Sequence, residues 1–539
     1  MPKKNGKTKK APTNEGARKP AAAPLAAPGS PKKYRARVRM YRHGLGDCFL
    51  LTFPRAGKKP FHILIDCGAL GRDAQWMTGV VEHIRDTVRN GKETVAHLDL
   101  VVATHEHKDH LSGFNQARDV FEKDFSFGGV WLGWTENLTQ PEIQKLKESK
   151  KKASALLRKA LDSPIASDPV THLVREPLDG IAAFLAFSED DQPADSGPTT
   201  ASAASDGEQK PSTRTIAGAL EYLKLCGKKC GNIEYLEPGT GPLKLDGVED
   251  VSIYVLGPPR DPALLKGSEV TEQMKKDGVI YHLASTGEMG MDALGAAIPA
   301  MNALSDSDGD RYYPFSREHR ISLQVPDPSS PNRLRDNPYF EVIREFLTTT
   351  YNDPTQAWRR IDHDWLNAFG QLALDLDNDT NNTSLVLAFE FGKTREVLLF
   401  VGDAQVGNWR SWANVQFNVP NSAQPLPAHD LLRRTVFYKV GHHASHNATL
   451  KNGGLELMKR EDLVAFIPLD KETAASQGIK DPVTGKPKGW AMPAPQLYKA
   501  LMKKAGERVV ISDAKEAVTL DPKTTHVYAT DTFIDYFLI

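Results

Sequence analysis

The sequence predicts an α/β fold whose strands end in clusters of polar residues that bind metals well. Two observations support this prediction. Short apolar runs with strand character recur along the 539 residues and alternate with segments of helical periodicity. Three of these runs lead directly into His- and Asp-rich segments, near residues 105, 403 and 442. Because the loops at strand ends converge in α/β proteins, we expect these segments to form one composite site.

The N-terminal part of the predicted core contains strands around one helix. Residues 34–53 have the pattern strand, turn, strand, and residues 61–68 form an apolar strand that ends in Asp-Cys-Gly. Residues 73–90 predict a helix, and residues 98–103 predict a strand apolar enough to be buried on both faces. The buried face of the helix is expected to carry Trp76, Val80, Ile84 and Val88.

The remaining elements are expected to form one domain over residues 34–539 with two insertions, at about 126–234 and 262–378. The first insertion includes a low-complexity loop at 188–213. Helices are expected at 141–161, 215–225 and 495–505, and strands at 242–245, 251–256, 384–391, 397–401, 435–440, 463–467 and 508–512.

The N-terminal tail, residues 1–33, differs from the rest of the chain in charge and composition. Residues 1–39 hold 12 Lys or Arg and one acidic residue, Glu15, whereas the whole chain is neutral. A tail rich in Pro, Ala and Lys cannot bury a core, so it is expected to be disordered. It is either an arm that contacts nucleic acid or another polyanion, or a solubilising extension without a specific partner.

The composition favours a cytoplasmic protein without a membrane segment. About 40% of the residues are hydrophobic and 25% are charged, and no run of 18 apolar residues occurs. The basic N-terminus lacks the apolar stretch of a secretory signal. Four cysteines do not make a disulfide framework in a chain of this length, and Cys48 and Cys67 are expected to be core residues.

The segment His105-x-His107-x-Asp109-His110 carries the chemistry. It follows a predicted buried strand, and neutral imidazoles with a carboxylate suit zinc, manganese or iron. Side chains two positions apart in an extended segment point the same way, so His105 and His107 can bind one ion. The chain has to turn for Asp109 and His110 to face a second ion.

Two later segments extend this predicted site. Asp403 follows the apolar run 398–401, and His442 follows the strand expected at 435–440. A carboxylate at the first position can bridge two cations, whose charge keeps it ionised. Together with the first segment they form a pattern typical of two-metal sites.

These segments resemble the metallo-β-lactamase superfamily, and most closely the hydrolase-like domain of ComEC-type DNA-uptake proteins. The resemblance covers about half of the chain, is highly specific for the fold and does not specify the substrate. The segments that carry it, besides the first His-rich segment, are 46–51, 64–68, 251–258, 381–387, 398–403 and 439–445.

The resemblance implies an αββα sandwich and hydrolysis by a metal-bound hydroxide. It implies two divalent metal ions, with zinc as the first expectation and manganese as the second. His105, His107 and Asp403 would bind one ion; Asp109, His110, Asp403 and His442 would bind the other. Asp66 and Asp47 would orient these ligands from behind, and Asp109 would be essential for catalysis. His443 or His446 would stabilise developing charge or protonate the leaving group, unless either is a solvent-exposed loop residue.

The sequence departs from the family pattern at two places. The wider superfamily often has a metal-binding His between the first segment and the bridging Asp. Only His172, His282, His319 and His363 lie in that interval, and none of them follows a convincing core strand. One ion is therefore expected to have fewer protein ligands. Near the C-terminal helix, Met492 stands before Pro493 where the look-alike group often has His.

The function expected from these features is that of a phosphodiesterase or nuclease acting on a nucleic acid or nucleotide. Two ions can stabilise both the attacking and the leaving oxygen of a displacement at phosphorus. Hydrolysis of a lactone, thioester or β-lactam is the alternative, because the same fold and metals support it. A third hypothesis is a regulatory or binding module whose insertions contact a protein partner.

Overall fold

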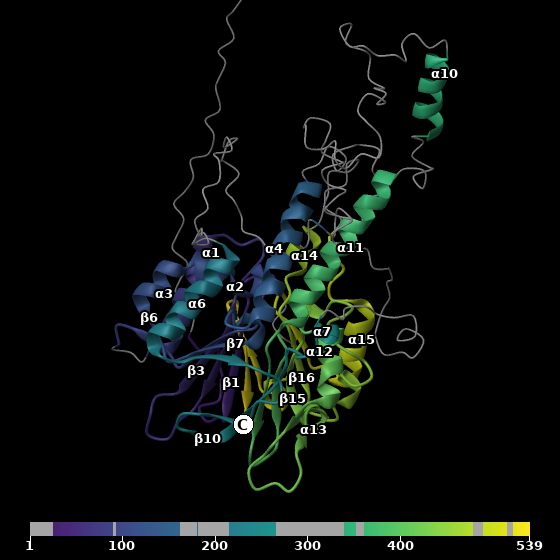
Figure 1. Cartoon of the computed structure of the whole chain (residues 1–539). Coiled ribbons are helices and arrows are strands. Elements are labelled where there is room, and N and C mark those ends of the chain that lie inside the picture. The colour runs from purple at the N-terminus through teal and green to yellow at the C-terminus, as the bar shows by residue number, and fades with distance from the viewer. Residues whose placement is uncertain are drawn as a thin grey trace, which may run out of the picture.

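Two β-sheets face each other in this computed structural model, and helices cover their outer faces (Figure 1). The structure describes residues 25–89, 93–161, 181, 215–265, 339–351, 361–477, 489–514 and 521–539. The mixed α/β class expected from the sequence is confirmed. Among the described residues, every helix is too short or too polar to traverse a lipid bilayer.

The first sheet has eight strands within the described residues, and its parallel part lies on the side of the β5–β7–β8 edge. The strand β3 pairs antiparallel with β2 and parallel with β5. The order across the sheet is β18 (Val527–Ala529), β19 (Phe533–Leu538), β1 (Ala36–Tyr41), β2 (Cys48–Phe53), β3 (Phe61–Cys67), β5 (Leu100–Ala103), β7 (Val130–Gly133) and β8 (Ile233–Leu236).

The second sheet has seven strands within the same described ranges and is also mixed. Its strands β12, β15, β16 and β17 are mutually parallel, whereas β10, β11 and β12 are antiparallel. The order is β17 (Val509–Ile511), β16 (Val464–Ile467), β15 (Thr435–Lys439), β12 (Val397–Phe400), β11 (Val386–Phe391), β10 (Val248–Gly257) and β9 (Leu243–Leu245).

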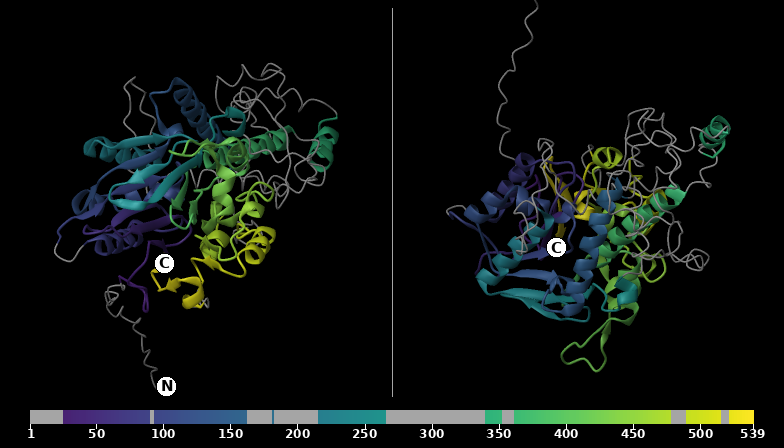
Figure 2. Two further views of the ribbon diagram at one scale, coloured as in Figure 1. Left: turned by 90° about the horizontal axis from the view of Figure 1, so that it is seen from below. Right: turned by 45° about the horizontal axis from the view of Figure 1, so that its top comes forward.

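The helices and the two sheets form four layers (Figure 2). Three apolar clusters hold these layers together. One cluster lies between the sheets and joins residues such as Phe49 to Phe400, whose rings meet edge to face. A second packs helices on the first sheet: α1 (Ala74–Val88), α2 (Lys108–Gln116), α3 (Arg118–Asp124) and α6 (Ile216–Cys230). A third packs helices on the second sheet: α12 (Val406–Ser411), α13 (Ala428–Arg433), α14 (Lys471–Ala475) and α15 (Pro495–Lys504).

Two long helices lie side by side above one end of the sandwich (Figures 1 and 2). The first, α4 (Pro141–Leu161), matches the helix expected at 141–161. The second, α11 (Ile361–Asn382), comes from the segment expected to be the second insertion and leads directly into the second sheet. Shorter described helices are α7 (Pro262–Leu265), α10 (Phe340–Glu345) and α16 (Pro522–Thr525).

Several expected elements differ from the structure. Trp76 is 48% exposed, and Met77 takes the expected place of Trp76 on the buried face of α1. The indole of Trp76 lies at the helix edge, where Nε1 donates to the carbonyl of His43 at 2.9 Å. The strand expected at 98–103 is divided into β4 (Ala96–Leu98) and β5. The buried positions of Cys48 and Cys67 agree with the expectation.

The expected tail and first insertion both contain parts of the packed core. Ala27 is buried in the cluster on the outer face of the first sheet, so residues 25–33 are not a disordered tail. The strands β7 and β8, with α6, lie in the interval 126–234 and extend the first sheet. Pairing across the sheet decides their place, since β7 pairs with β5 and β8 pairs with β7. The loop at 188–213 lies outside the described residues.

A buried ion pair attaches the C-terminal strand to β1. Arg39 and Asp535 stand opposite each other in the register of β1 and β19, and both side chains are fully buried. Two hydrogen bonds join the groups, Nε to Oδ1 at 2.7 Å and Nη2 to Oδ2 at 2.8 Å. The guanidinium also lies 3.4 Å from the centre of the Phe533 ring. Losing one partner would therefore leave the other charge buried and uncompensated.

We expect Asp535→Asn to lower the free energy of unfolding by about 3–5 kcal/mol, because it leaves the guanidinium of Arg39 without its counter-charge. Urea unfolding followed by circular dichroism measures the change. The matched control is Asp462→Asn, which breaks the exposed pair with Arg460 and is expected to cost less than about 1 kcal/mol. Equal effects of the two substitutions would contradict the assigned role of the buried pair.

Candidate metal centre

The candidate site lies where strands of both sheets end. In the first sheet, β3 leads to Asp66 and β5 leads to the His-rich segment that begins at His105. In the second sheet, β12 precedes Asp403 and β15 precedes His442. The backbone N–H of Leu385 donates to the carbonyl of Thr104 at 2.9 Å and so joins the two sheets beside the site. The composite site expected from the sequence thus has a structural basis in the junction of the sheets.

The turn that the His-rich segment requires is the start of helix α2. His107 has an extended backbone at the N-cap position, and Asp109 and His110 lie in the first helical turn. Glycines allow the neighbouring loops to approach this turn. A Cβ on Gly68 would lie 2.5 Å from backbone atoms of Asp109 and His110, and one on Gly46 would lie 2.2 Å from the carbonyl oxygen of Gly68. Substitution at either glycine would push this helical turn away from its position.

Asp66 fixes the ring of His110. The Oδ2 atom of Asp66 lies 2.7 Å from Nδ1 of His110, and its Oδ1 accepts from the backbone N–H of Thr104 at 2.8 Å. A carboxylate ion can only accept, so Nδ1 of His110 carries a proton. The Nε2 atom therefore faces Asp109 Oδ2 at 3.5 Å and Asp403 Oδ2 at 3.2 Å. This is the orienting contact that was expected of Asp66.

One oxygen of Asp403 is held by the protein, and the other faces the site. Its Oδ1 accepts from the backbone N–H of His442 at 2.8 Å and from Nζ of Lys439 at 3.2 Å. Lys439 also forms an ion pair with Asp47, and both of its partners are buried. The backbone N–H of Asp403 donates to Ser384 Oγ at 3.0 Å. Oδ2 is thus the oxygen of Asp403 that is available to a cation.

The two adjacent histidines after β15 point in different directions. His443 Nδ1 donates to the carbonyl of Pro468 at 2.6 Å, and its Nε2 lies 2.7 Å from Asp109 Oδ2. His442 turns its Nδ1 to Gln405 Nε2 at 3.0 Å and to Ser445 Oγ at 2.8 Å. This separation follows from the backbone, which has φ of 43° at His442 and 49° at His443. Positive φ at non-glycine residues is uncommon and concentrates at functional sites.

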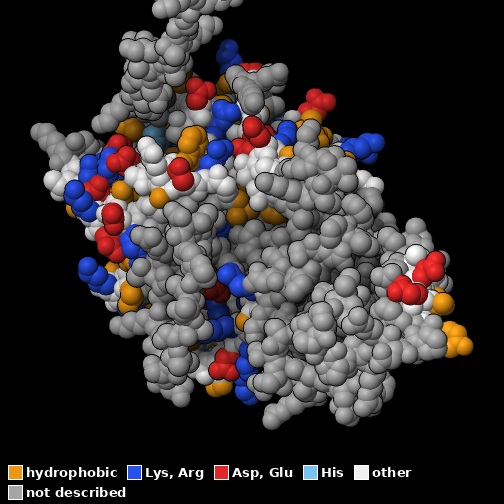
Figure 3. Space-filling view, turned by 90° about the horizontal axis from the view of Figure 1, so that it is seen from above, with side chains coloured by type: hydrophobic (Ala, Val, Ile, Leu, Met, Phe, Trp, Pro, Cys, Tyr) orange, Lys and Arg blue, Asp and Glu red, His pale blue; other side chains and the backbone are white. Residues whose placement is uncertain are grey.

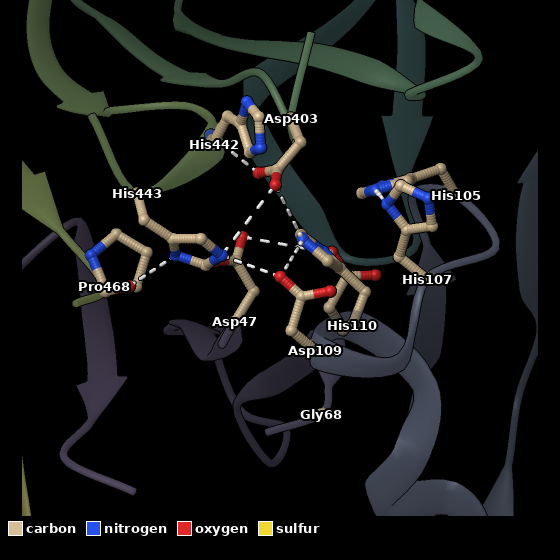
Figure 4. Close-up of polar contacts among 12 residues, drawn as sticks. Asp47, Gly68, His105, His107, Asp109, His110, Asp403, His442, His443 and Pro468 are labelled. Atoms are coloured by element: carbon tan, nitrogen blue, oxygen red, sulfur yellow. Dashed lines mark hydrogen bonds and ion pairs between the residues drawn. The ribbon is translucent and has the colours of Figure 1, made fainter. Parts of the chain in front are cut away.

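Four buried side chains converge on one point, as Figure 4 shows. One ligand atom from each lies within 4.8 Å of the ligand atoms of the other three, so the group could hold a metal ion. A second group with the same spacing consists of Asp47, Asp66 and His110. The members of the first group are Asp109, His110, Asp403 and His443.

His105 and His107 form a pair beside this group (Figure 4). His105 Nε2 lies 3.1 Å from His107 Nδ1, and the rings of His105 and His110 are 4.1 Å apart between centres. The other nitrogen of His105 faces Thr104 Oγ1 at 3.1 Å and Ser384 Oγ at 3.3 Å. Burial lowers the pKa of both histidines, that of His107 to about 3, so both rings are neutral ligands at physiological pH.

Charge compensation explains the pKa directions in the group. Burial by itself would lower the pKa of His110, but Asp403, Asp109 and further carboxylates outweigh it and raise the pKa well above its usual value. His443 responds in the same way, mainly through its hydrogen bond to Asp109. Burial would raise the pKa of Asp403, but His110 and Lys439 hold it well below its usual range. Protons on the two histidines thus occupy the place where a cation would act.

The donor set fits divalent cations. The carboxylates of Asp47, Asp66, Asp109 and Asp403 are buried, and the ammonium group of Lys439 pairs with those of Asp47 and Asp403. Buried anions need compensating charge. Within the described ranges, Asp47 Oδ1, Asp109 Oδ1 and His110 Nε2 are buried without a hydrogen-bond partner. Carboxylate oxygens and imidazole nitrogens are the ligands that zinc and manganese take in proteins.

The structure brings together most of the site residues expected from the sequence, with one exchange. His443 joins the buried group, in the position expected for His442, because the positive φ values turn the two rings apart. His446 is exposed and lies outside the group. The described side chains do not include those of His172, His282, His319 and His363.

Three residues of the site were not identified from the sequence, namely Thr104, Ser384 and Lys439. The lysine offers a recognisable indication, since it ends an otherwise apolar strand and a buried ammonium group needs a carboxylate partner. The hydroxyls of Thr104 and Ser384 give no comparable indication, because their partners Asp66, His105 and Asp403 are brought to them only by the fold.

Beside the His-rich segment, α4 and α11 enclose a cavity of about 200 Å³. Glu106 turns away from its two neighbouring histidines toward α4, where Lys147 bridges it to Glu136 at 2.8 and 2.6 Å. Leucines from both helices, such as Leu146 and Leu376, form the apolar wall. The cavity therefore joins an apolar wall to a charged end next to the candidate site.

The sequence was compared with protein-family models and with curated proteins. Neither a family model nor a curated protein matches the chain. The assignment therefore depends on the geometry and chemistry of the residues themselves.

We expect His443→Ala to weaken zinc binding at least about tenfold, because it removes a nitrogen that faces Asp109. His442→Ala is the matched comparison, since its ring points to Gln405 and Ser445, and it is expected to have the smaller effect. Competition with a chromophoric chelator measures both affinities. A larger loss in the His442→Ala protein would restore the ligand set expected from the sequence.

Proposed function

We propose that the protein is a metal-dependent hydrolase of metallo-β-lactamase type and that it cleaves phosphodiester bonds. The observation that carries the proposal is the buried group of Asp109, His110, Asp403 and His443 at the junction of two sheets. Buried polar atoms normally have a hydrogen-bond partner. A bound cation would explain why some carboxylate and imidazole atoms of this group have none among the described residues.

The architecture supports the metallo-β-lactamase part of the proposal. The layers run helix, sheet, sheet, helix, and the polar segments at 105–110, 403 and 442–443 lie at the strand ends of both sheets. This order of layers is consistent with the sandwich that the resemblance implies and so supports the proposal. The resemblance assigns the same segments to the site from the sequence alone, independently of the geometry of the structure.

The proposed centre takes two ions side by side. Asp109, His110, Asp403 and His443 would hold one ion, and His105 and His107 would hold the other. Oδ2 is the oxygen of Asp403 that the protein leaves available to a cation. Two such ions supply Lewis acidity and lower the pKa of a coordinated water to about 7. The protein residues around them keep the ligands in place: Asp66 orients His110, the Pro468 carbonyl orients His443, and Lys439 holds Asp403.

A phosphodiester is favoured as the substrate because it is an anion whose hydrolysis adds negative charge. The carboxylates of the centre would repel such a group, and two divalent cations reverse that repulsion. On the face seen in Figure 3, acidic and basic side chains are interspersed over the described residues.

We expect the full-length protein with zinc or manganese to cleave bis(p-nitrophenyl) phosphate, and Asp109→Ala and Asp403→Ala to lower kcat/KM at least about a hundredfold. The physical reason is that each substitution removes a carboxylate of the central group. Elemental analysis of the same samples gives the metal content. Asp430→Asn, which removes an exposed carboxylate, is the control and is expected to keep full activity.

The same assay set tests the substrate class. DNA, RNA and cyclic nucleotides test the phosphodiester proposal, and a lactone, a thioester and a β-lactam test the carbonyl alternative. Turnover of a carbonyl substrate alone would replace the phosphodiester assignment while keeping the metal centre. Absence of bound metal in a folded protein would overturn both.

A further inference from the structure

Helix α11 brings one carboxylate to the edge of the candidate centre. Asp377 is in its penultimate turn, and its Oδ1 lies 3.9 Å from Nε2 of His107. The two residues are far apart in the sequence, and the segment that contains most of α11 lies between β10 and β11. No role for this helix follows from the ligand pattern of the sequence.

The environment of Asp377 holds its carboxylate in this orientation. Its Oδ2 accepts from the side-chain amide of Asn381, one turn later, at 3.1 Å. Its Oδ1 is buried and, among the described residues, makes no hydrogen bond. Burial, together with the charges of Asp109 and Asp403, raises the pKa of Asp377 to about 7. An oriented acceptor atom is thus available on the outer side of His107.

The two nitrogens of His107 have different surroundings. Nδ1 lies 3.1 Å from Nε2 of His105, and two nitrogens that bind one zinc ion at about 2.0–2.1 Å lie roughly 3 Å apart. This pair therefore uses Nδ1 of His107 toward the ion. Nε2 then carries the proton and points outward, where Asp377 Oδ1 is located.

We propose that Asp377 is a positioning residue for His107: it accepts a hydrogen bond from Nε2–H and so fixes the tautomer whose Nδ1 binds metal. The inference rests on the proposed metal centre. A shift of less than about 1 Å brings the 3.9 Å separation of Nε2 and Oδ1 into hydrogen-bonding range. Carboxylates that accept from the second nitrogen of a histidine ligand raise its basicity and fix its orientation.

A direct metal–Asp377 bond is a less consistent arrangement. An ion bound by Asp377 would lie next to Nε2 of His107, so Nε2 would have to be the ligand atom of this histidine. Nε2 of His105 instead faces Nδ1 of His107, on the other side of the ring. The positioning role uses both contacts of His107 at once. It also links the centre to α11, whose Leu372 and Leu376 line the cavity beside α4.

We expect Asp377→Ala to weaken zinc binding about 10- to 100-fold, whereas Asp377→Asn retains most of the affinity because its amide oxygen still accepts from Nε2–H. Asp379→Asn is the control, since it removes a carboxylate of the same helix that lines the cavity beside α4. Chelator competition measures affinity, and the visible absorption of the cobalt-substituted protein reports the ligand environment. Circular dichroism of the metal-free proteins verifies folding.

Each outcome distinguishes the inference from its premise. Loss of affinity in both Asp377 variants would mean that Asp377 binds the metal directly and would overturn the positioning role. Affinities and cobalt spectra equal to those of the Asp379→Asn protein would overturn any role of Asp377 at the centre. A folded wild-type protein that binds no metal would remove the premise itself, and with it the proposed function.

Discussion

The burial of four carboxylates at the junction of two sheets is the constraint on which the rest of the site depends. Such a concentration of negative charge is stable only with nearby positive charge. Lys439 provides one charge for Asp47 and Asp403, and the protonated rings of His110 and His443 provide more. Cations can provide the same positive charge as the protons of His110 and His443, because the ligand atoms of the group already converge.

The same constraint explains the supporting contacts. Three side chains of the central group have a second atom that the protein holds: His110 by Asp66, Asp403 by Lys439 and His443 by the Pro468 carbonyl. A carbonyl can only accept, so it determines which ring nitrogen faces the centre. The left-handed backbone after β15 stores strain at this point, and the buried packing of the second sheet holds it in place.

The architecture shows how separate segments contribute to one centre. Residues near 47, 66 and 105–110 come from the first sheet, and residues near 403 and 443 come from the second. The hydrogen bond from Leu385 N–H to the Thr104 carbonyl and the contact of Ser384 Oγ with His105 Nδ1 tie these parts together. The α4–α11 pair adds a cavity with a charged end beside the histidines.

The sequence by itself determined the α/β class, the strands that deliver the site and the chemical type of its ligands. These follow from apolar periodicity and from the residue types in short segments, which are local properties of the chain. Only the tertiary structure decided that His443 and not His442 joins the central group, and that Lys439, Ser384 and Asp377 lie beside it. It also placed β7, β8 and the C-terminal strands in the first sheet. The reason is physical: ring direction depends on backbone dihedrals, and partner choice depends on packing between residues far apart in sequence.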